Sequence, residues 1–89
     1  MNYRVELTPA AKRDLRALTA DTQDRVISAL QRLAEGPRAH GARKLRGELR
    51  VQDAWRLRVG GYRVLYVIDD EARVVTVFAV GHRARVYRP

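Results

Sequence analysis

The chain of 89 residues contains no cysteine and only two histidines. Disulfide bonds and thiolate metal sites are therefore excluded. No carboxylate lies at metal-ligand spacing from His40 or His82, so we also expect no zinc site and no cofactor. No apolar run approaches the roughly 20 residues that a membrane helix requires. Arg4 and Glu6 fall where the apolar part of a signal peptide would begin, so we expect a cytoplasmic protein that binds no membrane.

Acidic residues are scarce where the basic residues are most concentrated. The net charge is +8, and 16 of the 18 basic residues are arginine. Residues 38–63 hold eight basic and two acidic residues, and residues 81–89 hold three arginines and no acid. A GC-rich genome would account for the number of arginines but not for their clustering. Because the planar guanidinium binds phosphate oxygens in pairs, the distribution predicts a nucleic acid as partner.

The hydrophobic pattern predicts a single α+β domain over residues 1–89, with the order β-α-α-β-β-β. Residues 3–7 alternate between apolar and polar side chains and are expected to form a strand. Two helices follow, and their short connection predicts an antiparallel hairpin that packs on a mainly antiparallel, twisted sheet. The first helix is expected to begin at Thr8-Pro9 and to end near Leu18. The second is expected to be capped by Asp21 or Thr22 and to end at Gly36-Pro37.

Three further strands are expected in the C-terminal half. Ala54–Val59 and Tyr62–Ile68 flank Gly60-Gly61, which predicts a two-residue hairpin turn. Arg73–Val80 is a valine-rich strand, and both faces of the last two strands are apolar, which places them at the centre of the sheet. Residues 38–53 are expected to form a basic loop. The alternative is that this loop contains a short strand near residues 49–51.

The hairpin register gathers three arginines on one face of the sheet. With Gly60-Gly61 as the loop, Arg58 lies opposite Arg63. Side chains alternate along a strand, so Arg56 shares their face while Trp55 points to the core. Like charges that face each other destabilise a sheet, so we expect an external anion such as RNA phosphate to neutralise them.

The last strand should return antiparallel to its neighbour and end beside the diglycine turn. It would bring His82 and Arg83 to the arginines, with Tyr87 close behind in sequence. The alternative to a phosphate site is a solvated arginine face, screened by salt and paired with Asp53 or Glu48.

Four stretches in this order and spacing resemble the RelE/ParE superfamily of toxins from type II toxin–antitoxin modules. They are Lys44–Gly47, Trp55–Arg63, Val64–Tyr66 and Val80–Arg83 with Val86-Tyr87. RelE-type members cleave mRNA in the ribosomal A site, whereas ParE-type members poison DNA gyrase and generally lack the basic active-site set. The residues that correspond to this set are Arg56, Arg58, Arg63, Arg83 and Tyr87, and their presence favours the ribonuclease.

The resemblance implies a metal-independent endoribonuclease, in which the ribose 2′-hydroxyl attacks the adjacent phosphate. Arginines suit the stabilisation of phosphorane charge, but their pKa lies so far above neutral pH that they are poor general bases. His82 and Tyr87 are the other candidates for proton transfer, because imidazole titrates near neutral pH and a phenol can exchange a proton. We expect Lys44, Arg46 and Arg50 to contact ribosomal RNA.

The resemblance also implies a cognate antitoxin, acidic and partly helical, that covers the exposed sheet and helices and blocks the arginine site. Two other functions remain open from the sequence. One is a gyrase-inhibiting toxin without nuclease chemistry. The other is an RNA-binding module, which would show salt-dependent binding without cleavage or toxicity.

Overall fold

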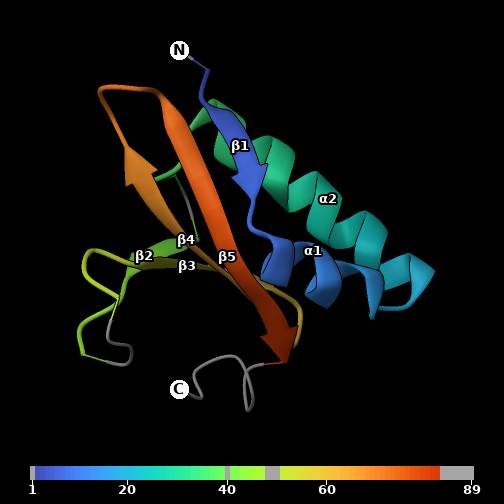
Figure 1. Cartoon of the computed structure of the whole chain (residues 1–89). Coiled ribbons are helices and arrows are strands. Elements are labelled where there is room, and N and C mark those ends of the chain that lie inside the picture. Colours follow the sequence, from blue (N-terminus) through green and yellow to red (C-terminus); the bar gives the residue numbers. More distant parts are fainter. Residues whose placement is uncertain (1, 40, 48–50, 83–89) are drawn as a thin grey trace.

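The computed structural model describes residues 2–39, 41–47 and 51–82. Two helices and five strands follow one another along this part of the chain (Figure 1). They are β1 (Arg4–Leu7), α1 (Pro9–Arg16), α2 (Ala20–Glu35), β2 (Ala42–Lys44), β3 (Trp55–Val59), β4 (Tyr62–Asp69) and β5 (Val74–His82). The predicted α+β class and the helical hairpin on a sheet are confirmed.

The five strands form one sheet in the order β1-β5-β4-β3-β2. β1 pairs with β5 in parallel, and every other neighbouring pair is antiparallel. β4 and β5 are therefore internal strands, as their two apolar faces predict. The antiparallel return of β5 places Tyr62 opposite His82 and Arg63 opposite Gly81. The C-terminal end of β5 thus lies beside the β3–β4 turn, as expected.

Threonines begin both helices. The Thr8 side chain accepts a hydrogen bond from the Ala11 amide (3.1 Å), and Pro9 follows as the first helical residue. The predicted cap of α2 at Asp21 or Thr22 is wrong, because the helix begins directly after Thr19. The Thr19 hydroxyl accepts from the Thr22 amide at 3.3 Å. α1 also ends earlier than predicted, at Arg16, whereas Gly36 ends α2 as expected.

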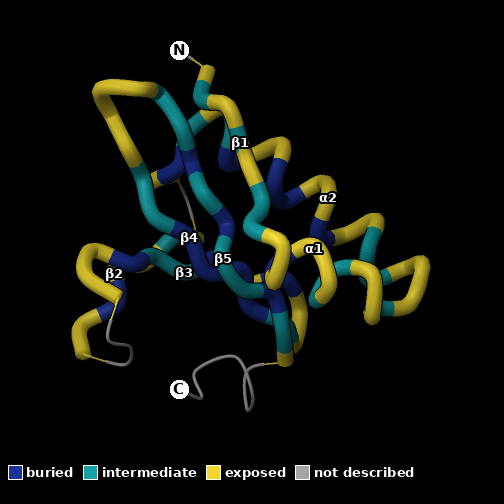
Figure 2. The backbone as a smooth tube through the Cα atoms, in the orientation of Figure 1, coloured by how far each residue is buried: buried dark blue, intermediate teal, exposed yellow. Residues whose placement is uncertain are grey.

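The main core lies between the two helices and one face of the sheet. Val26, Leu33 and Tyr66 are among its buried residues, and Trp55 packs against it as predicted. Figure 2 shows buried backbone along the inner side of α2 and the middle of the sheet. A second, smaller cluster lies on the opposite face, which no described helix covers. It consists of Leu45, Ala54 and Leu65 with the partly buried Phe78 and Ala79.

The described residues of the segment between α2 and β3 contain one strand, which lies outside the predicted position. β2 spans Ala42–Lys44 and pairs with β3, while residues 48–50, where part of the alternative strand was expected, lie outside the described residues. A strand of three residues is too short to reveal itself by alternation. Neither helix is long and apolar enough to cross a membrane, as judged from the described residues.

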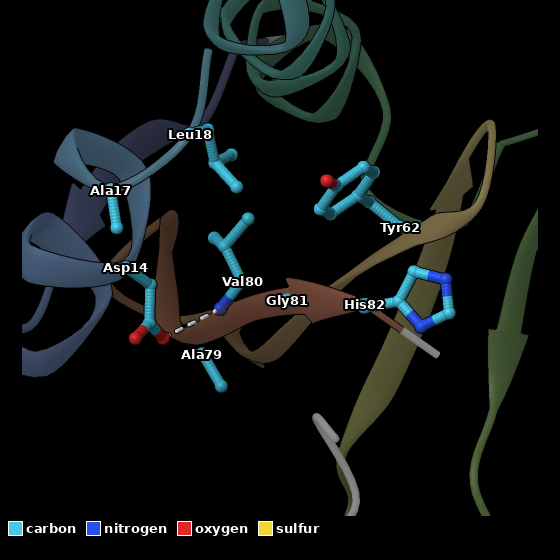
Figure 3. Close-up of a pocket in the computed structure, with 8 residues that line it drawn as sticks. All are labelled: Asp14, Ala17, Leu18, Tyr62, Ala79, Val80, Gly81 and His82. Carbon is cyan, nitrogen blue, oxygen red and sulfur yellow. Dashed lines mark hydrogen bonds between the residues drawn. The ribbon is translucent and has the colours of Figure 1, made fainter. Parts of the chain in front are cut away.

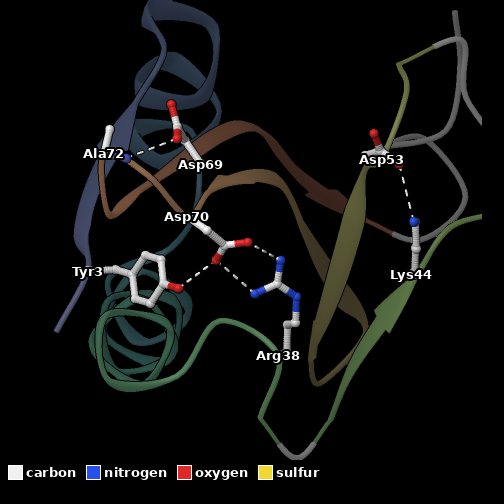
Figure 4. A network of polar contacts seen from close by, with 7 residues as sticks. All are labelled: Tyr3, Arg38, Lys44, Asp53, Asp69, Asp70 and Ala72. Carbon is white, nitrogen blue, oxygen red and sulfur yellow. Dashed lines mark hydrogen bonds and ion pairs between the residues drawn. The ribbon is translucent and has the colours of Figure 1, made fainter. Parts of the chain in front are cut away.

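A polar network ties together the end of the sheet that is distant from the β3–β4 turn (Figure 4). Arg38 donates two hydrogen bonds to the Asp70 carboxylate, at 3.0 and 2.9 Å, and the Tyr3 hydroxyl donates a third at 2.6 Å. The hydrogen bonds from Arg38 and then Tyr3 lower the pKa of Asp70 to about 2. Arg38 also lies 5.6 Å from the centre of the Trp55 ring. The network therefore joins the residue that precedes β1, the loop after α2 and the β4–β5 turn.

Candidate functional site

The diglycine turn sets the geometry of the site. Val59 pairs with Tyr62 and Arg58 pairs with Arg63, so the predicted hairpin register is confirmed. Gly60 has a φ of +61°, a left-handed conformation that glycine adopts without the steric cost of a Cβ atom. The arginines lie on the open face, because Leu57 and Val59 between and beside them point into the main core.

Arg63 is the only buried charged residue in the described part of the chain. It is 7% exposed, and its Nη1 atom donates a 3.3 Å hydrogen bond to the carbonyl of Tyr62. Opposite it on β5 stands Gly81, which has no side chain to pair with the guanidinium. A charge held in this way is costly unless it is compensated. The arrangement therefore suits an anion that approaches from the open face.

A hollow of about 270 Å³ lies at the turn, lined by Arg58, Gly60, Gly61, Arg63 and His82. By alternation His82 belongs to the same face as Tyr62, which is the helix side of the sheet. Its ring nevertheless reaches the turn, since a Cβ atom on Gly61 would lie 3.8 Å from Nε2 of His82. Because Gly60 and Gly61 have no side chains, the imidazole from one face of the sheet and the two guanidinium groups from the other face line the same hollow.

A larger groove of about 640 Å³ adjoins this hollow and shares His82 with it. Figure 3 shows Asp14, Ala17 and Leu18 of the α1 region on one side and Tyr62 and His82 on the other. Ala79, Val80 and Gly81 of β5 complete the lining. Asp14 is the only acidic residue among these lining residues, and its Oδ2 atom accepts a 3.0 Å hydrogen bond from the Val80 amide.

Two arginines that lie near the site were not predicted from the sequence. Arg43 on β2 pairs with Arg56 and is exposed, so it extends the arginine face towards the sheet edge. Only the basic character of residues 38–63 hints at it, because β2 was not recognised. Arg25 of α2 lies close to the turn, with Nη1 3.9 Å from the position of a Cβ atom on Gly60. No sequence signal links that helix position to the hairpin.

The other predicted site residues that the structure describes do not line the hollow at the turn. Arg56 shares the face of Arg58 but does not line the hollow. Lys44 pairs with Asp53 at 3.2 Å, so Asp53 neutralises a lysine of β2. Arg46 is exposed beside β2. The remaining predicted residues lie outside the described residues, and these are His40, Glu48, Arg50, Arg83 and Tyr87.

Residues 5–87 match the family described as ParE toxin of type II toxin–antitoxin system, parDE. The chain belongs to this RelE/ParE superfamily of toxins. Toxin RelG of Mycobacterium tuberculosis is 37% identical over 90 residues, which cover 99% of this chain and 99% of that relative. The mRNA interferase toxin RelE of Escherichia coli K12 is 34% identical over 87 residues, covering 96% of this chain and 87% of the relative.

Solved structures of the superfamily share the fold. The archaeal RelE–RelB complex from Pyrococcus horikoshii aligns with a TM-score of 0.79 and 25% identity, over 97% of this chain and 100% of the solved chain. The isolated Escherichia coli RelE toxin aligns with a TM-score of 0.75 and 29% identity, over 90% of this chain and 83% of the solved chain. The protein is thus a RelE-like toxin of a toxin–antitoxin module, with two helices on a five-stranded sheet.

Proposed function

We propose that this toxin is an endoribonuclease that cleaves mRNA in the A site of the ribosome. The observation that carries the proposal is the hollow in which Arg58 and Arg63 meet His82. A relative of similar length bears the name mRNA interferase toxin RelE, which agrees with this chemistry. Two guanidinium groups at one hollow match the geometry of a phosphate diester, whose oxygens accept hydrogen bonds in pairs.

The proposed reaction forms a bond between the ribose 2′-oxygen and the adjacent phosphorus and breaks the bond to the 5′-oxygen. A base takes the proton of the 2′-hydroxyl, and an acid gives a proton to the leaving 5′-oxygen. The products are a 2′,3′-cyclic phosphate and a 5′-hydroxyl. Arg63 and Arg58 stabilise the charge that develops on the phosphorane oxygens. Arg83 is assigned to the same task, and Arg56 supports the RNA backbone beside it.

Proton transfer is assigned to His82, with Tyr87 as its partner. Arginine is charged in proteins and therefore cannot serve as a base without a very large perturbation. Among the described residues that line the hollow, His82 alone carries an imidazole, a group suited to general acid–base catalysis. Its ring contacts Tyr62 edge-on, with the centroids 5.9 Å apart and the planes at 85°. This contact favours one orientation of the imidazole beside the arginines.

The ribosome is proposed to supply the alignment that the toxin lacks. The hollow is small, and both Arg58 and His82 are exposed, so little in the toxin alone holds RNA in line for attack. Orientation of reacting groups accounts for a large share of catalytic power. Lys44, Arg46 and Arg50 are assigned to contacts with ribosomal RNA, and Arg43 adds an exposed charge to that surface.

An acidic, partly helical antitoxin is the proposed second partner. The solved RelE–RelB complexes of relatives are precedents for such an assembly. The open face of the sheet offers both parts of a complementary surface, namely the arginines and the partly buried Phe78 and Ala79. An apolar helix that carries carboxylates would cover both and block the hollow.

Inhibition of DNA gyrase is the competing function, because the matched family description is that of ParE. The double variant Arg63→Ala/Arg83→Ala distinguishes the two. We expect it to abolish toxicity together with the mRNA cuts that primer extension detects after induction. Persistent toxicity with DNA damage would support gyrase as the target. The matched control Arg4→Ala/Arg32→Ala removes two exposed arginines that do not line the hollow at the turn, and it should leave the cuts unchanged.

A further inference from the structure

Arg25 of α2 reaches the diglycine turn from the helix side of the sheet. Its Nη1 atom lies 3.9 Å from the position of a Cβ atom on Gly60. The neighbouring glycine has the corresponding contact with an imidazole, since Nε2 of His82 lies 3.8 Å from the position of a Cβ atom on Gly61. Both glycines are exposed and line the hollow of the two arginines. The turn thus has a third guanidinium beside it, on the side opposite to the open face.

Arg25 forms no ion pair with any described residue, although its own helix offers an acidic partner. Asp21 precedes it by four positions, which is the spacing and the order in which a carboxylate and a guanidinium pair most favourably on a helix surface. The Arg25 side chain extends towards the turn instead, and no carboxylate is present among the described residues that line the hollow there. A guanidinium without a counter-ion beside other cations suits an external anion.

We propose that Arg25 binds a phosphate of the mRNA next to the scissile phosphate, so that the RNA backbone crosses the diglycine turn. The inference rests on the proposed nuclease function, which places the scissile phosphate at Arg58 and Arg63. Consecutive phosphates of one strand are joined by a single nucleotide, so a chain anchored in the hollow carries its neighbouring phosphates over the adjoining surface. Gly60 and Gly61 leave that surface free of side chains, and the Arg25 guanidinium lies beside it.

A phosphate contact changes RNA affinity without reading sequence, because every nucleotide carries the same phosphate. An exposed ion pair changes an equilibrium constant by up to about fivefold, which is the loss of RNA affinity expected for Arg25→Ala. Binding to Arg25 also releases one counter-ion from single-stranded RNA. The slope of log affinity against log salt should therefore become less steep by about 0.7 in the variant. The difference between the two proteins should shrink as salt is added.

Binding to short RNA tests the contact one linkage at a time. The probe is a fluorescent hexanucleotide with a 2′-O-methyl group at its central linkage, which removes the attacking hydroxyl and prevents cutting. Each linkage in turn is replaced by an uncharged methylphosphonate, and affinities are measured by anisotropy at low salt. Neutralising one linkage next to the blocked one should weaken binding by wild type about fivefold and leave Arg25→Ala unaffected. Arg58→Ala should instead become less sensitive at the blocked linkage itself.

Arg32→Ala is the matched control, because Arg32 is also exposed on α2 but lies seven positions later, beside Gly36 and Ala39. It should respond to every neutralised linkage as wild type does. The inference is overturned if Arg25→Ala keeps the wild-type sensitivity at every linkage, or if wild type does not bind the probe. It is also overturned if Arg25→Ala cuts more slowly on ribosomes but binds the probe like wild type, since the charge would then contact ribosomal RNA.

Cleavage on ribosomes separates this inference from the proposed function. If the toxin cuts no ribosome-bound mRNA but Arg25→Ala still loses its sensitivity at one linkage, the nuclease proposal fails and the phosphate contact stands. If the toxin cuts mRNA and the two proteins respond alike to every neutralised linkage, the phosphate contact fails and the nuclease proposal stands.

Discussion

Arg58 and Arg63 face each other across β3 and β4, yet Arg58 is exposed and Arg63 is only 7% exposed. The buried guanidinium is fixed by the strand and by its hydrogen bond to the Tyr62 carbonyl. The exposed guanidinium keeps its rotamer freedom until a ligand binds. The pair thus combines a rigid phosphate contact with an adaptable one.

Replacing Arg63 should reduce mRNA cleavage more than replacing Arg58. Arg63→Lys keeps the charge but loses the planar pair of donors, so we expect cleavage of ribosome-bound mRNA to fall by on the order of 10²-fold. Arg58→Lys should cost less, since an exposed lysine can still reach the phosphate. Single-turnover cleavage rates measure both, and Arg4→Lys on β1 is the control. Equal rates for Arg63→Lys and wild type would contradict the assignment.

The turn should tolerate some residues and not others. Gly60 has a φ of +61°, which asparagine adopts more readily than most residues but a β-branched side chain does not. Gly60→Val should lower the free energy of unfolding by about 1–2 kcal/mol and reduce cleavage, whereas Gly60→Asn should largely retain both. Denaturant unfolding and cleavage rates test this pair. A fully active, fully stable Gly60→Val would show that the turn does not set the arginine geometry.

Asp70 should make stability sensitive to acid. Hydrogen bonds from Arg38 and Tyr3 hold the pKa of Asp70 at about 2, below its ordinary value of 3.8. A lowered folded-state pKa means that the stabilisation is present above the ordinary value and disappears as the pH falls towards 2. Asp70→Asn should therefore melt below wild type at pH 6, and the gap should close near pH 2. A gap that is the same at both pH values, or an equal gap for the exposed control Asp24→Asn, would contradict this account.

Tyr66 links the core to the loop after α2. Its ring is fully buried, burial raises its pKa, and its hydroxyl donates a 2.6 Å hydrogen bond to the Pro37 carbonyl. Tyr66→Phe leaves that carbonyl without its donor, so the free energy of unfolding should fall by about 1–3 kcal/mol. Tyr62→Phe is the matched control, since no described residue hydrogen-bonds its hydroxyl. Equal denaturation midpoints for the two variants would show that the Pro37 contact contributes nothing.

The hairpin could be predicted from the sequence because it depends on local information. A diglycine between two alternating runs sets both the turn and the register, and the register alone determines that Arg58 faces Arg63. The order of the C-terminal strands also follows, since two internal strands must be apolar on both faces. The α2 cap was missed because Thr19, Asp21 and Thr22 are all good capping residues within four positions.

Contacts between distant segments could not be predicted in this way. Asp14 and Val80 are 66 positions apart, and nothing in either neighbourhood indicates that a carboxylate of α1 pairs with the edge of β5. The three residues of β2 are too few to show a period, so the sequence did not predict that Arg43 lies on a strand beside the other arginines. Alternation places His82 on the helix side, and only the structure reveals that its ring reaches around Gly61 to the arginines.

The most direct test of the central claim compares one end-labelled mRNA in two states, bound to ribosomes with an empty A site and free in solution. Purified toxin should cut the ribosome-bound message within the A-site codon and leave a 2′,3′-cyclic phosphate, while the free message stays almost intact. Arg63→Ala should lose the cut without losing its folded circular-dichroism spectrum. Equally fast cutting of the free message, or an undiminished cut by folded Arg63→Ala, would contradict the account.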